Sequence, residues 1–173
     1  MILYPDYYCD KITDISIELL NSNDIKGLIL DIDNTLIDFD RNILKGAKEW
    51  VDKMKENGIK CIILSNTNKV DKVTKVADCL DLPYIYLATK PLKRGFKKAK
   101  NELGLESKNI AAIGDQIFTD VLGANRSKIF SILVNPISKK DLWMTRLKRP
   151  LEELVVKSYV KKQKKKEEKK NVW

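Results

Sequence analysis

The stretch LILDIDNTL, residues 28–36, decides the fold. It begins as a short apolar run and changes abruptly to polar residues at Asp31 and Asp33. An apolar run without polar alternation is typical of a strand that is buried on both faces of a parallel sheet. We therefore predict a buried strand here, and four similar runs predict further strands at residues 59–64, 84–87, 110–113 and 129–134.

Longer amphipathic stretches separate these runs and predict helices over residues 43–57, 69–80, 92–103 and 118–127. Gly58 and Gly104 follow two of these stretches, at a position where glycine commonly ends a helix. The alternation predicts an α/β fold, a Rossmann-like doubly wound parallel sheet with right-handed crossovers and helices on both faces.

The two ends of the chain follow a different pattern. We predict that residues 1–25 form an N-terminal segment packing on the core, with a short helix capped by Thr13 and ending at Asn21. Residues 161–173 read KKQKKKEEKKNVW, a basic low-complexity tail that we expect to be disordered. Residues 26–160 are predicted to form the single domain, whose last helix docks through Leu151, Leu154, Val155 and Val156.

The composition limits the chemistry that is open to the chain. Its 173 residues include 43% apolar side chains, enough for one core, and no histidine. The lack of histidine excludes Ser-His-Asp and Cys-His hydrolases, histidine-ligated zinc and histidine phosphotransfer. The three cysteines have no CxxC spacing, which argues against a disulfide framework or a structural zinc site and fits a reducing cytoplasm.

Positive charge is concentrated in the last fifth of the chain. Residues 1–138 carry 20 Lys and Arg against 19 Asp and Glu, whereas residues 139–173 carry 13 against 5. No apolar run approaches the ~20 residues that span a bilayer, and the acidic start lacks the basic region of a signal peptide. We expect a cytoplasmic protein whose tail is a solvated terminus, a peripheral contact with anionic membrane lipid, or a contact with nucleic acid. Glu167 and Glu168 weaken both binding interpretations.

Polar side chains follow four predicted strands, at the edge where open α/β sheets bind ligands. Asp31 and Asp33 point to the same side of an extended chain, and with Asp115 they form an oxygen-rich cluster suited to Mg²⁺. Without a cation, carboxylates this close would repel one another. Ordinary structural roles are the alternative, such as helix caps and braces. The residues in question are Asp31, Asp33, Ser65, Asn66, Thr89, Lys90, Asp115 and Asp120.

The same residues suit phosphoryl transfer. Ser65 and Lys90 offer the hydroxyl and ammonium groups that hold the equatorial oxygens of a phosphoryl group. One carboxylate can attack phosphorus and form an aspartyl-phosphate, while another transfers protons. The basic run from Lys90 to Lys100 is either a solvated helix face or a surface that binds an anionic scaffold. The sequence therefore predicts an enzyme that acts on a phosphorylated substrate.

Four motifs in order resemble those of the haloacid dehalogenase (HAD) superfamily of aspartate-nucleophile phosphatases. LILDIDNTL resembles the first motif, hhhhDxDxT, LSN and TKP resemble the second and third, and IGDQIFTD resembles the fourth in its GDx4D form. These motifs span residues 27–120. The strings GDQIFTDVLGANR, TKP and VNPI resemble the bacterial YqeG-like branch, of HAD IIIA type, which is similar to phosphatidylglycerophosphate phosphatases; this narrower resemblance covers most of residues 1–150.

The resemblance implies a role for each matching carboxylate. Asp31 would be the nucleophile. Asp33 would protonate the leaving oxygen and then activate the water that hydrolyses the intermediate. Mg²⁺ would be held by Asp31, the backbone carbonyl of Asp33 and Asp115, with Asp120 bracing the metal site. Asp at position 33 favours phosphatase or phosphotransferase chemistry, because dehalogenases and P-type ATPases of the superfamily carry other residues there.

The resemblance also implies how substrate is held. Ser65, with Asn66 beside it, and Lys90 would bind the transferring phosphoryl group, and Thr35 would support the loop. Lys93 is the alternative to Lys90 as the phosphate-binding lysine.

The motif spacing leaves no room for the cap domain that many HAD phosphatases insert. One helix and one strand fill the interval from Thr35 to Ser65, and another pair fills the interval from Ser65 to Lys90. An open site favours a bulky substrate, and the resemblance implies hydrolysis of phosphatidylglycerophosphate to phosphatidylglycerol. The alternatives are a phosphatase for a soluble sugar phosphate or a nucleic-acid end, or a HAD-fold protein that docks nucleic acid or a ribosomal particle.

Overall fold

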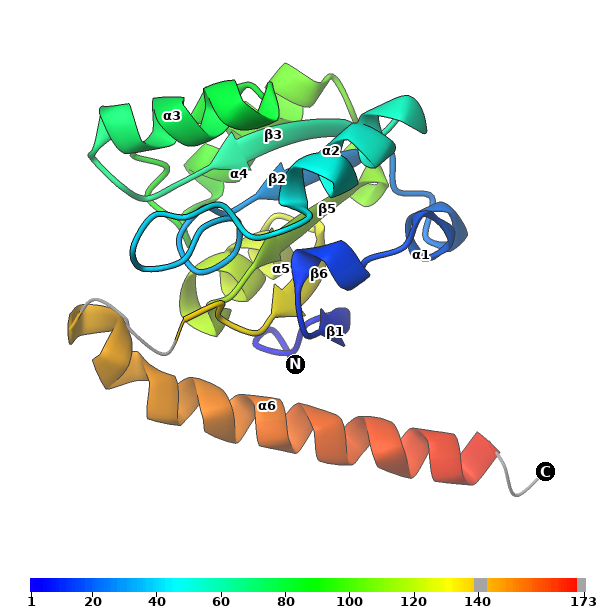
Figure 1. Ribbon diagram of the computed structural model, residues 1–173. Helices are drawn as coiled ribbons and strands as arrows, with labels where there is room; N and C mark the ends of the chain where they lie inside the picture. The colour runs from blue at the N-terminus through cyan, green and yellow to red at the C-terminus, as the bar shows by residue number, and fades with distance from the viewer. Residues whose placement is uncertain (139–142, 171–173) are drawn as a thin grey trace.

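Six parallel strands form the central sheet of the protein, whose computed structural model describes residues 1–138 and 143–170. The strands lie in the order β1-β6-β5-β2-β3-β4, and every paired neighbour runs parallel. This sheet confirms the predicted doubly wound α/β fold (Figure 1). The strand bounds are β1 Tyr7–Cys9, β2 Gly27–Leu30, β3 Lys60–Leu64, β4 Tyr84–Ile85, β5 Ile110–Gly114 and β6 Phe130–Val134.

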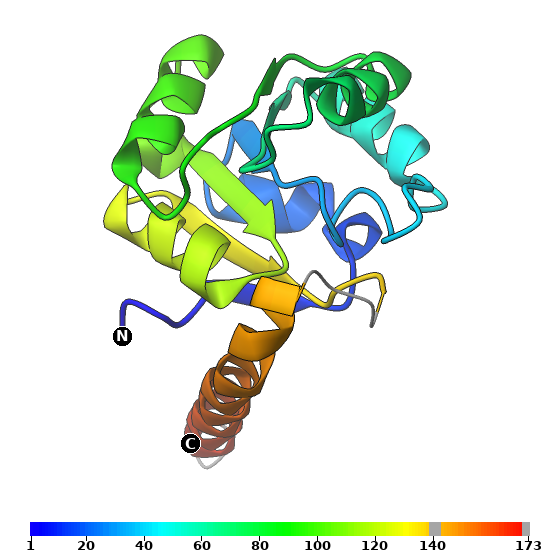
Figure 2. The same cartoon turned by 90° about the vertical axis from the view of Figure 1, so that its left-hand side faces the viewer.

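Helices cover both faces of the sheet (Figure 2). Residues of α1, α2 and α3 pack in one apolar cluster, and residues of α4 and α5 pack in a second cluster on the opposite face. The bounds are α1 Ile17–Ser22, α2 Ala47–Glu56, α3 Val70–Leu80, α4 Lys93–Leu103, α5 Leu122–Arg126 and α6 Trp143–Lys170, with 3₁₀ turns at Ile12–Asp14 and Ser107–Asn109 and a π-helical turn, η3, at Ile117–Val121. Between β2 and β6 the described chain contains no inserted cap domain.

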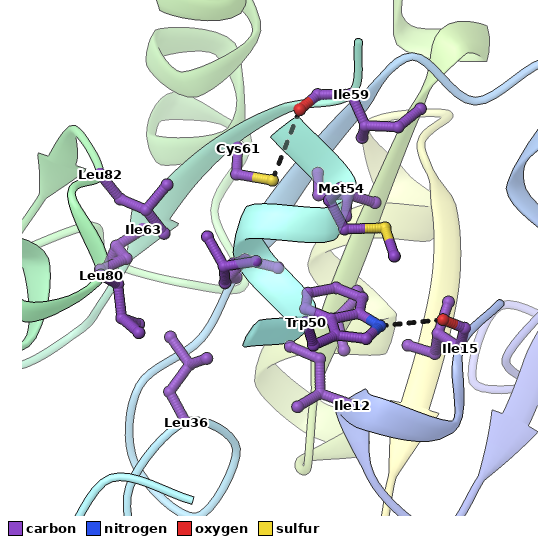
Figure 3. Packing of buried hydrophobic residues seen from close by; sticks show 14 of the residues in the cluster. Ile12, Ile15, Leu36, Trp50, Met54, Ile59, Cys61, Ile63, Leu80 and Leu82 are labelled. Carbon is purple, nitrogen blue, oxygen red and sulfur yellow. Dashed lines mark hydrogen bonds between the residues drawn. The ribbon is translucent and has the colours of Figure 1, made fainter. Parts of the chain in front are cut away.

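The central strand β2 shows why its sequence does not alternate. Leu28 and Leu30 pack in the cluster with α2 and α3, whereas Ile29 packs in the cluster with α4 and α5. Because both faces are covered, every position of the strand is buried. In the first cluster, the indole Nε1 of Trp50 donates a 2.9 Å hydrogen bond to the carbonyl oxygen of Ile15 and so ties α2 to the N-terminal segment (Figure 3).

The five predicted strands are present, but the edge strand β1 was not predicted. Its three residues pair with β6, in the register Tyr7 to Ile132. The pairing is reinforced by the Asp6 carboxylate, which accepts hydrogen bonds from the backbone N–H and the hydroxyl of Ser131. A strand this short has no periodic signal of its own. Its partner lies more than 120 residues away in the sequence.

The N-terminal helix begins later than predicted. We expected Thr13 as its cap, but Ser16 takes that position, and its hydroxyl oxygen accepts a 3.2 Å hydrogen bond from the backbone N–H of Leu19. Thr13 lies instead in the preceding 3₁₀ turn. Both residues are good caps, so the local sequence did not distinguish them.

The C-terminal helix differs from the prediction in two respects. Val155 and Val156 dock against the cluster around Leu133, as expected, but Leu151 and Leu154 are exposed to solvent. The helix also continues to Lys170, through part of the segment that we expected to be disordered. Lys, Glu and Gln are good helix formers, so a helix already anchored upstream can extend through them.

Pro150 lies inside α6, where the missing N–H and the ring disfavour a straight helix. The first turns of α6 bend away from the axis of the rest of the helix (Figure 1). This bend brings the start of α6 to the carboxyl edge of the sheet (Figure 2). Among the described helices, none is both long and apolar enough to cross a membrane.

Candidate active site

Lys90 lies at the centre of the candidate site. It follows β4, and its side chain is almost fully buried. Its ammonium nitrogen lies 2.5 Å from Oδ1 of Asp31 and 2.6 Å from Oδ1 of Asp120. Asp31 directly follows β2, and Asp120 lies in η3, after β5. The parallel strands thus bring three residues that are far apart in the sequence to one edge of the sheet.

Asn66 holds the loop that carries Lys90. The backbone N–H of Lys90 donates to Oδ1 of Asn66 at 2.6 Å, and Nδ2 of Asn66 donates to the carbonyl oxygen of Lys90 at 3.0 Å. The loop also contains Leu87 and Thr89 in the left-handed region, with φ of 51° and 57°. Asn66 is therefore a positioning residue for Lys90, and its predicted contact with substrate stays a prediction.

Three buried carboxylates converge beside Lys90. One oxygen from each of Asp31, Asp115 and Asp120 lies within 4.8 Å of the others. The side chain of Asp33 is outside this group, although sequence reasoning placed Asp33 among the metal ligands through its backbone carbonyl. A set of hard carboxylate oxygens is the ligand chemistry that Mg²⁺ prefers.

Burial dominates the electrostatics of this cluster. It raises the pKa of Asp31 to about 7, against the opposing effect of the Lys90 ammonium, and the neighbouring carboxylates Asp120 and Asp33 raise it further. Burial also raises the pKa of Asp115 well above its ordinary value, although the Arg149 guanidinium opposes this shift. Without a metal, therefore, Asp31 and Asp115 ionise less readily than ordinary aspartates.

Lys90 keeps its charge in the same surroundings. Burial by itself would lower the pKa of the ammonium, but the carboxylates of Asp120 and Asp31 together raise it above the ordinary lysine value. Lys90 is therefore a permanent cation at this site. It can balance a carboxylate and can donate hydrogen bonds to phosphoryl oxygens.

Gly114 allows Asp120 to approach the sheet. A Cβ atom at Gly114 would lie 2.3 Å from Cγ of Asp120, a distance that no side chain could keep. The Asp120 carboxylate also accepts a 3.2 Å hydrogen bond from the backbone N–H of Gln116, and the Thr119 hydroxyl lies 3.3 Å from it. The Gly-Asp pair of the fourth motif thus has a steric reason: the glycine makes room for the second aspartate.

Arg149 on α6 reaches into the site, and the sequence patterns did not point to it. Its Nη1 donates a 2.8 Å hydrogen bond to the backbone carbonyl oxygen of Asp115, and its Nη2 pairs with Oδ2 of the same residue. Nη1 also lies 3.3 Å from the buried carboxylate of Glu152, which accepts a 3.2 Å hydrogen bond from the N–H of Phe118. Arg149 and Glu152 therefore anchor α6 to the cluster.

Lys72 on α3 is a second residue that the sequence did not indicate. Its ammonium forms a short hydrogen bond with Oδ1 of Asp33. The Asp33 side chain is about half exposed, and the Lys72 side chain is mostly buried. The ion pair fixes the direction of the Asp33 carboxylate at the mouth of the site. Lys72 is one of two lysines on α3, and only the docking of this helix selects it.

The other predicted substrate-binding residues occupy different surroundings. Ser65 is buried at the end of β3, and its hydroxyl accepts a 3.2 Å hydrogen bond from the N–H of Thr67. Thr35 is buried in the loop after β2. Lys93 is exposed in the first turn of α4. The structure thus brings Lys90, and not Lys93, to the carboxylates, and the role of each residue in binding substrate stays a prediction.

One buried oxygen of the cluster, Oδ1 of Asp115, indicates that a cation fits there. Among the described residues, Oδ1 of Asp115 is buried without a hydrogen-bond partner, although Oδ2 of the same carboxylate is held by Arg149. A buried carboxylate oxygen without a partner is costly unless something binds it. Together with the oxygens of Asp31 and Asp120, it forms a donor set that fits Mg²⁺.

A shallow groove opens beside the Lys90 loop. It has a volume of about 610 Å³ and is lined in part by Tyr84, Tyr86, Leu87, Arg94 and Lys98. It adjoins the carboxylate cluster along the chain, since Thr89 also lines it. The lining is thus a mixture of aromatic, apolar and basic side chains.

Two comparisons with known proteins, one with a family model and one with a curated relative, agree with each other. The family model for haloacid dehalogenase-like hydrolases matches residues 40–128. The probable phosphatase YqeG of Bacillus subtilis (strain 168) is 39% identical over 153 residues, which cover 88% of this chain and 88% of the relative.

Two solved structures resemble the chain in fold. A putative beta-phosphoglucomutase from Thermotoga maritima is 13% identical with a TM-score of 0.57, and the match covers 69% of this chain and 89% of that one. An uncharacterized protein from Listeria monocytogenes serotype 4b is 22% identical with a TM-score of 0.56, and covers 68% and 85% respectively. At these identities the likeness concerns the fold alone.

Proposed function

Since the chain belongs to the haloacid dehalogenase-like hydrolases, we propose that it is a magnesium-dependent phosphatase that hydrolyses a phosphomonoester through an aspartyl-phosphate on Asp31. One observation carries the proposal: a permanently charged lysine lies between Asp31 and Asp120, beside a buried oxygen of Asp115 that has no partner among the described residues. A site that served only for packing has no need of this charge arrangement.

The chain's residues divide the reaction between them. The Asp31 carboxylate attacks phosphorus, and the bond from phosphorus to the ester oxygen breaks as Asp33 gives that oxygen a proton. Asp33 then takes a proton from water, whose oxygen attacks phosphorus and releases inorganic phosphate from Asp31. Lys90 and Ser65 hold the equatorial phosphoryl oxygens through both steps.

In this proposal the metal binds at the carboxylate cluster. The carboxylates of Asp31, Asp115 and Asp120 and the backbone carbonyl of Asp33 are the groups that would hold Mg²⁺. When bound, it would neutralise the carboxylate cluster and the negative charge of the phosphoryl group. Arg149 fixes one oxygen of Asp115 and leaves the other directed to the cluster.

The substrate that we propose is phosphatidylglycerophosphate, which would be converted to phosphatidylglycerol. Three features support a lipid. The described chain has no cap to enclose a small metabolite, and an amphiphilic groove adjoins the Lys90 loop. The motifs also resemble the YqeG-like branch, which is similar to phosphatidylglycerophosphate phosphatases. A phosphate presented at a membrane surface reaches an uncapped site without a closing movement of the enzyme.

A panel of substrates tests this proposal. We expect the full chain with Mg²⁺ to release phosphate faster from phosphatidylglycerophosphate in mixed micelles than from sugar phosphates or from phosphorylated oligonucleotide ends. The chelator-treated protein and Asp31→Asn should release none, whereas Asp78→Asn, at an exposed aspartate on α3, should behave as the wild type. Faster turnover of a sugar phosphate or an oligonucleotide end would overturn the lipid assignment. Equal turnover with and without a divalent cation would overturn the mechanism.

A further inference from the structure

The helix α6 carries apolar residues on the face that points away from the protein. Leu147, Leu151 and Leu154 follow the spacing that places side chains on one helical face, and they are 75%, 57% and 62% exposed. We call these three residues the leucine stripe. Docking uses the opposite face, where Arg149, Glu152, Val156 and Tyr159 contact the body of the protein.

An exposed apolar face on a helix that is already docked needs an explanation. Burying a leucine side chain stabilises a folded protein, so three leucines turned to solvent forgo a substantial stabilisation. The alternative orientation of α6, with the stripe against the sheet, would remove Arg149 from Asp115. The ion pairs of Arg149 with Asp115 and Glu152 therefore hold the helix in the orientation that exposes the stripe.

Basic residues continue the same face toward the C-terminus. Lys161 and Lys165 stand seven and eleven residues beyond Leu154, which by helical spacing places them in line with the stripe. Lys157 and Lys164 flank them, and all four lysines are exposed. This part of α6 extends away from the sheet (Figure 2). Leucines followed by lysines along one helix are typical of helices that lie in the interface of an anionic membrane.

We propose that the outward face of α6 is a membrane-contact surface, on which the leucine stripe enters the acyl-chain boundary while the lysines bind anionic headgroups. A second copy of this chain fits less well, because the lysines of two helices would repel each other. RNA would use the lysines but would leave the leucines in water. An anionic bilayer is the partner that satisfies both parts of the face.

The surface and the carboxylate cluster lie on opposite sides of the first turns of α6. Leu147 and Leu151 each lie two residues from Arg149, which by helical spacing turns them away from the side on which Arg149 holds Asp115. The presentation of a lipid phosphomonoester to Asp31 rests on the proposed function above, whereas membrane binding by α6 does not depend on it.

Vesicle flotation with the full chain tests the inference. The probes are vesicles of phosphatidylcholine alone and vesicles in which about one-third of the lipid is phosphatidylserine, which supplies anionic charge without a phosphomonoester. We expect binding to the anionic vesicles only. Changing the stripe to glutamine at all three positions should weaken this binding at least about tenfold. Changing Lys161, Lys164 and Lys165 to glutamine should weaken it and flatten its dependence on salt.

Two controls keep the result specific. Ile2→Gln removes an apolar side chain of similar exposure, 53%, outside α6, and it should change binding by less than about twofold. Circular dichroism and turnover of p-nitrophenyl phosphate without vesicles should be the same in the stripe variant as in the wild type. A loss of either would mean that the stripe supports the fold, and would overturn the assignment.

Each remaining outcome of the vesicle experiment also tests one part of the proposal. Equal binding by the wild type and the stripe variant would overturn the role of the leucines, and equal binding to neutral vesicles would overturn the role of the lysines. Self-association that depends on the stripe and occurs without lipid would assign this face to a second copy. If vesicles bind as expected but no phosphomonoester is hydrolysed, then the proposed function fails while the membrane surface stands.

Discussion

Arg149 donates a hydrogen bond to the backbone carbonyl oxygen of Asp115 and forms an ion pair with one oxygen of its carboxylate. The other oxygen of that carboxylate is buried and has no partner among the described residues. Arg149 on the last helix thus binds one oxygen of Asp115, a candidate metal ligand, and leaves the other oxygen available to a cation. The docking of α6 therefore determines which oxygen of Asp115 faces the carboxylate cluster.

Replacing Arg149 tests this link. Arg149→Met should lower the free energy of unfolding by about 3 kcal/mol, because it leaves the buried carboxylates of Asp115 and Glu152 without their cation. Urea titrations of the metal-free protein measure this change. Lys148→Met, at the exposed neighbouring position, should stay within about 0.5 kcal/mol of the wild type. Equal stability of the two variants would mean that the Arg149 ion pair contributes nothing.

The stability of the metal-free protein should fall as the pH rises. The pKa of Asp31 is raised from 3.8 to about 7 in the folded protein, so between these values the folded state binds more protons than the unfolded state. The free energy of unfolding should therefore decrease with pH across this window, by up to about 1.4 kcal/mol per pH unit. Asp31→Asn removes the group and should flatten the profile. A rise in wild-type stability from pH 4 to 7 would contradict the buried-carboxylate account.

Added Mg²⁺ should reverse that loss. The cation needs ionised carboxylates, so its stabilising effect should be larger at about pH 8 than at about pH 5.5. Thermal unfolding with Mg²⁺ and with chelator at both pH values measures the difference. Asp115→Asn should reduce the effect of Mg²⁺ strongly. A Mg²⁺ effect of equal size in this variant would place the cation elsewhere.

The contact between Gly114 and Asp120 predicts a steric effect. Gly114→Ala should lower activity at least about tenfold, because the new methyl group would push Asp120 away from Lys90. Gly27→Ala is the matched control in a neighbouring strand. There the new Cβ would meet a methyl group at the end of the Leu105 side chain, which can move. Gly27→Ala should therefore keep its turnover of p-nitrophenyl phosphate, and comparable activity in both variants would contradict the steric argument.

The pairing of Lys72 with Asp33 predicts a change in kcat. Lys72→Met should lower kcat about tenfold and leave KM nearly unchanged, because Asp33 would lose the partner that fixes its direction for proton transfer. Lys72→Arg should restore part of the activity. Lys75→Met, at an exposed position on the same helix, serves as the control. A variant that changes KM alone would assign Lys72 to substrate binding instead.

The sequence alone could predict the parts of the site that follow from strand polarity. Asp31, Ser65 and Asp115 each follow a buried apolar run, and Lys90 follows the partly exposed apolar run of the edge strand β4. Parallel strands must bring such positions to one edge. The doubly wound fold follows from the same runs, since burial on both faces requires helices on both faces. Local pattern and elementary geometry are sufficient for these inferences.

The other features depend on packing between distant segments. Arg149 lies 34 residues after Asp115, and only the path of α6 brings it to the cluster. The docking of α3 brings Lys72, and not Lys75 of the same helix, to Asp33. The edge strand at Tyr7–Cys9 forms because β6 offers it a partner. From the sequence we predicted that the last helix docks through Leu151, Leu154, Val155 and Val156. The two valines dock, but the two leucines are exposed, because Arg149 and Glu152 anchor the opposite face of α6.

The most direct test of the central claim is to trap the intermediate. Asp33→Asn should still accept a phosphoryl group from p-nitrophenyl phosphate, whose leaving group needs no proton, and should hydrolyse it slowly. Mass spectrometry after acid quenching should then find one added phosphoryl group, on the peptide that contains Asp31. Steady release of phosphate with no adduct on that peptide, or with an adduct on another residue, would contradict the assignment of Asp31 as the nucleophile.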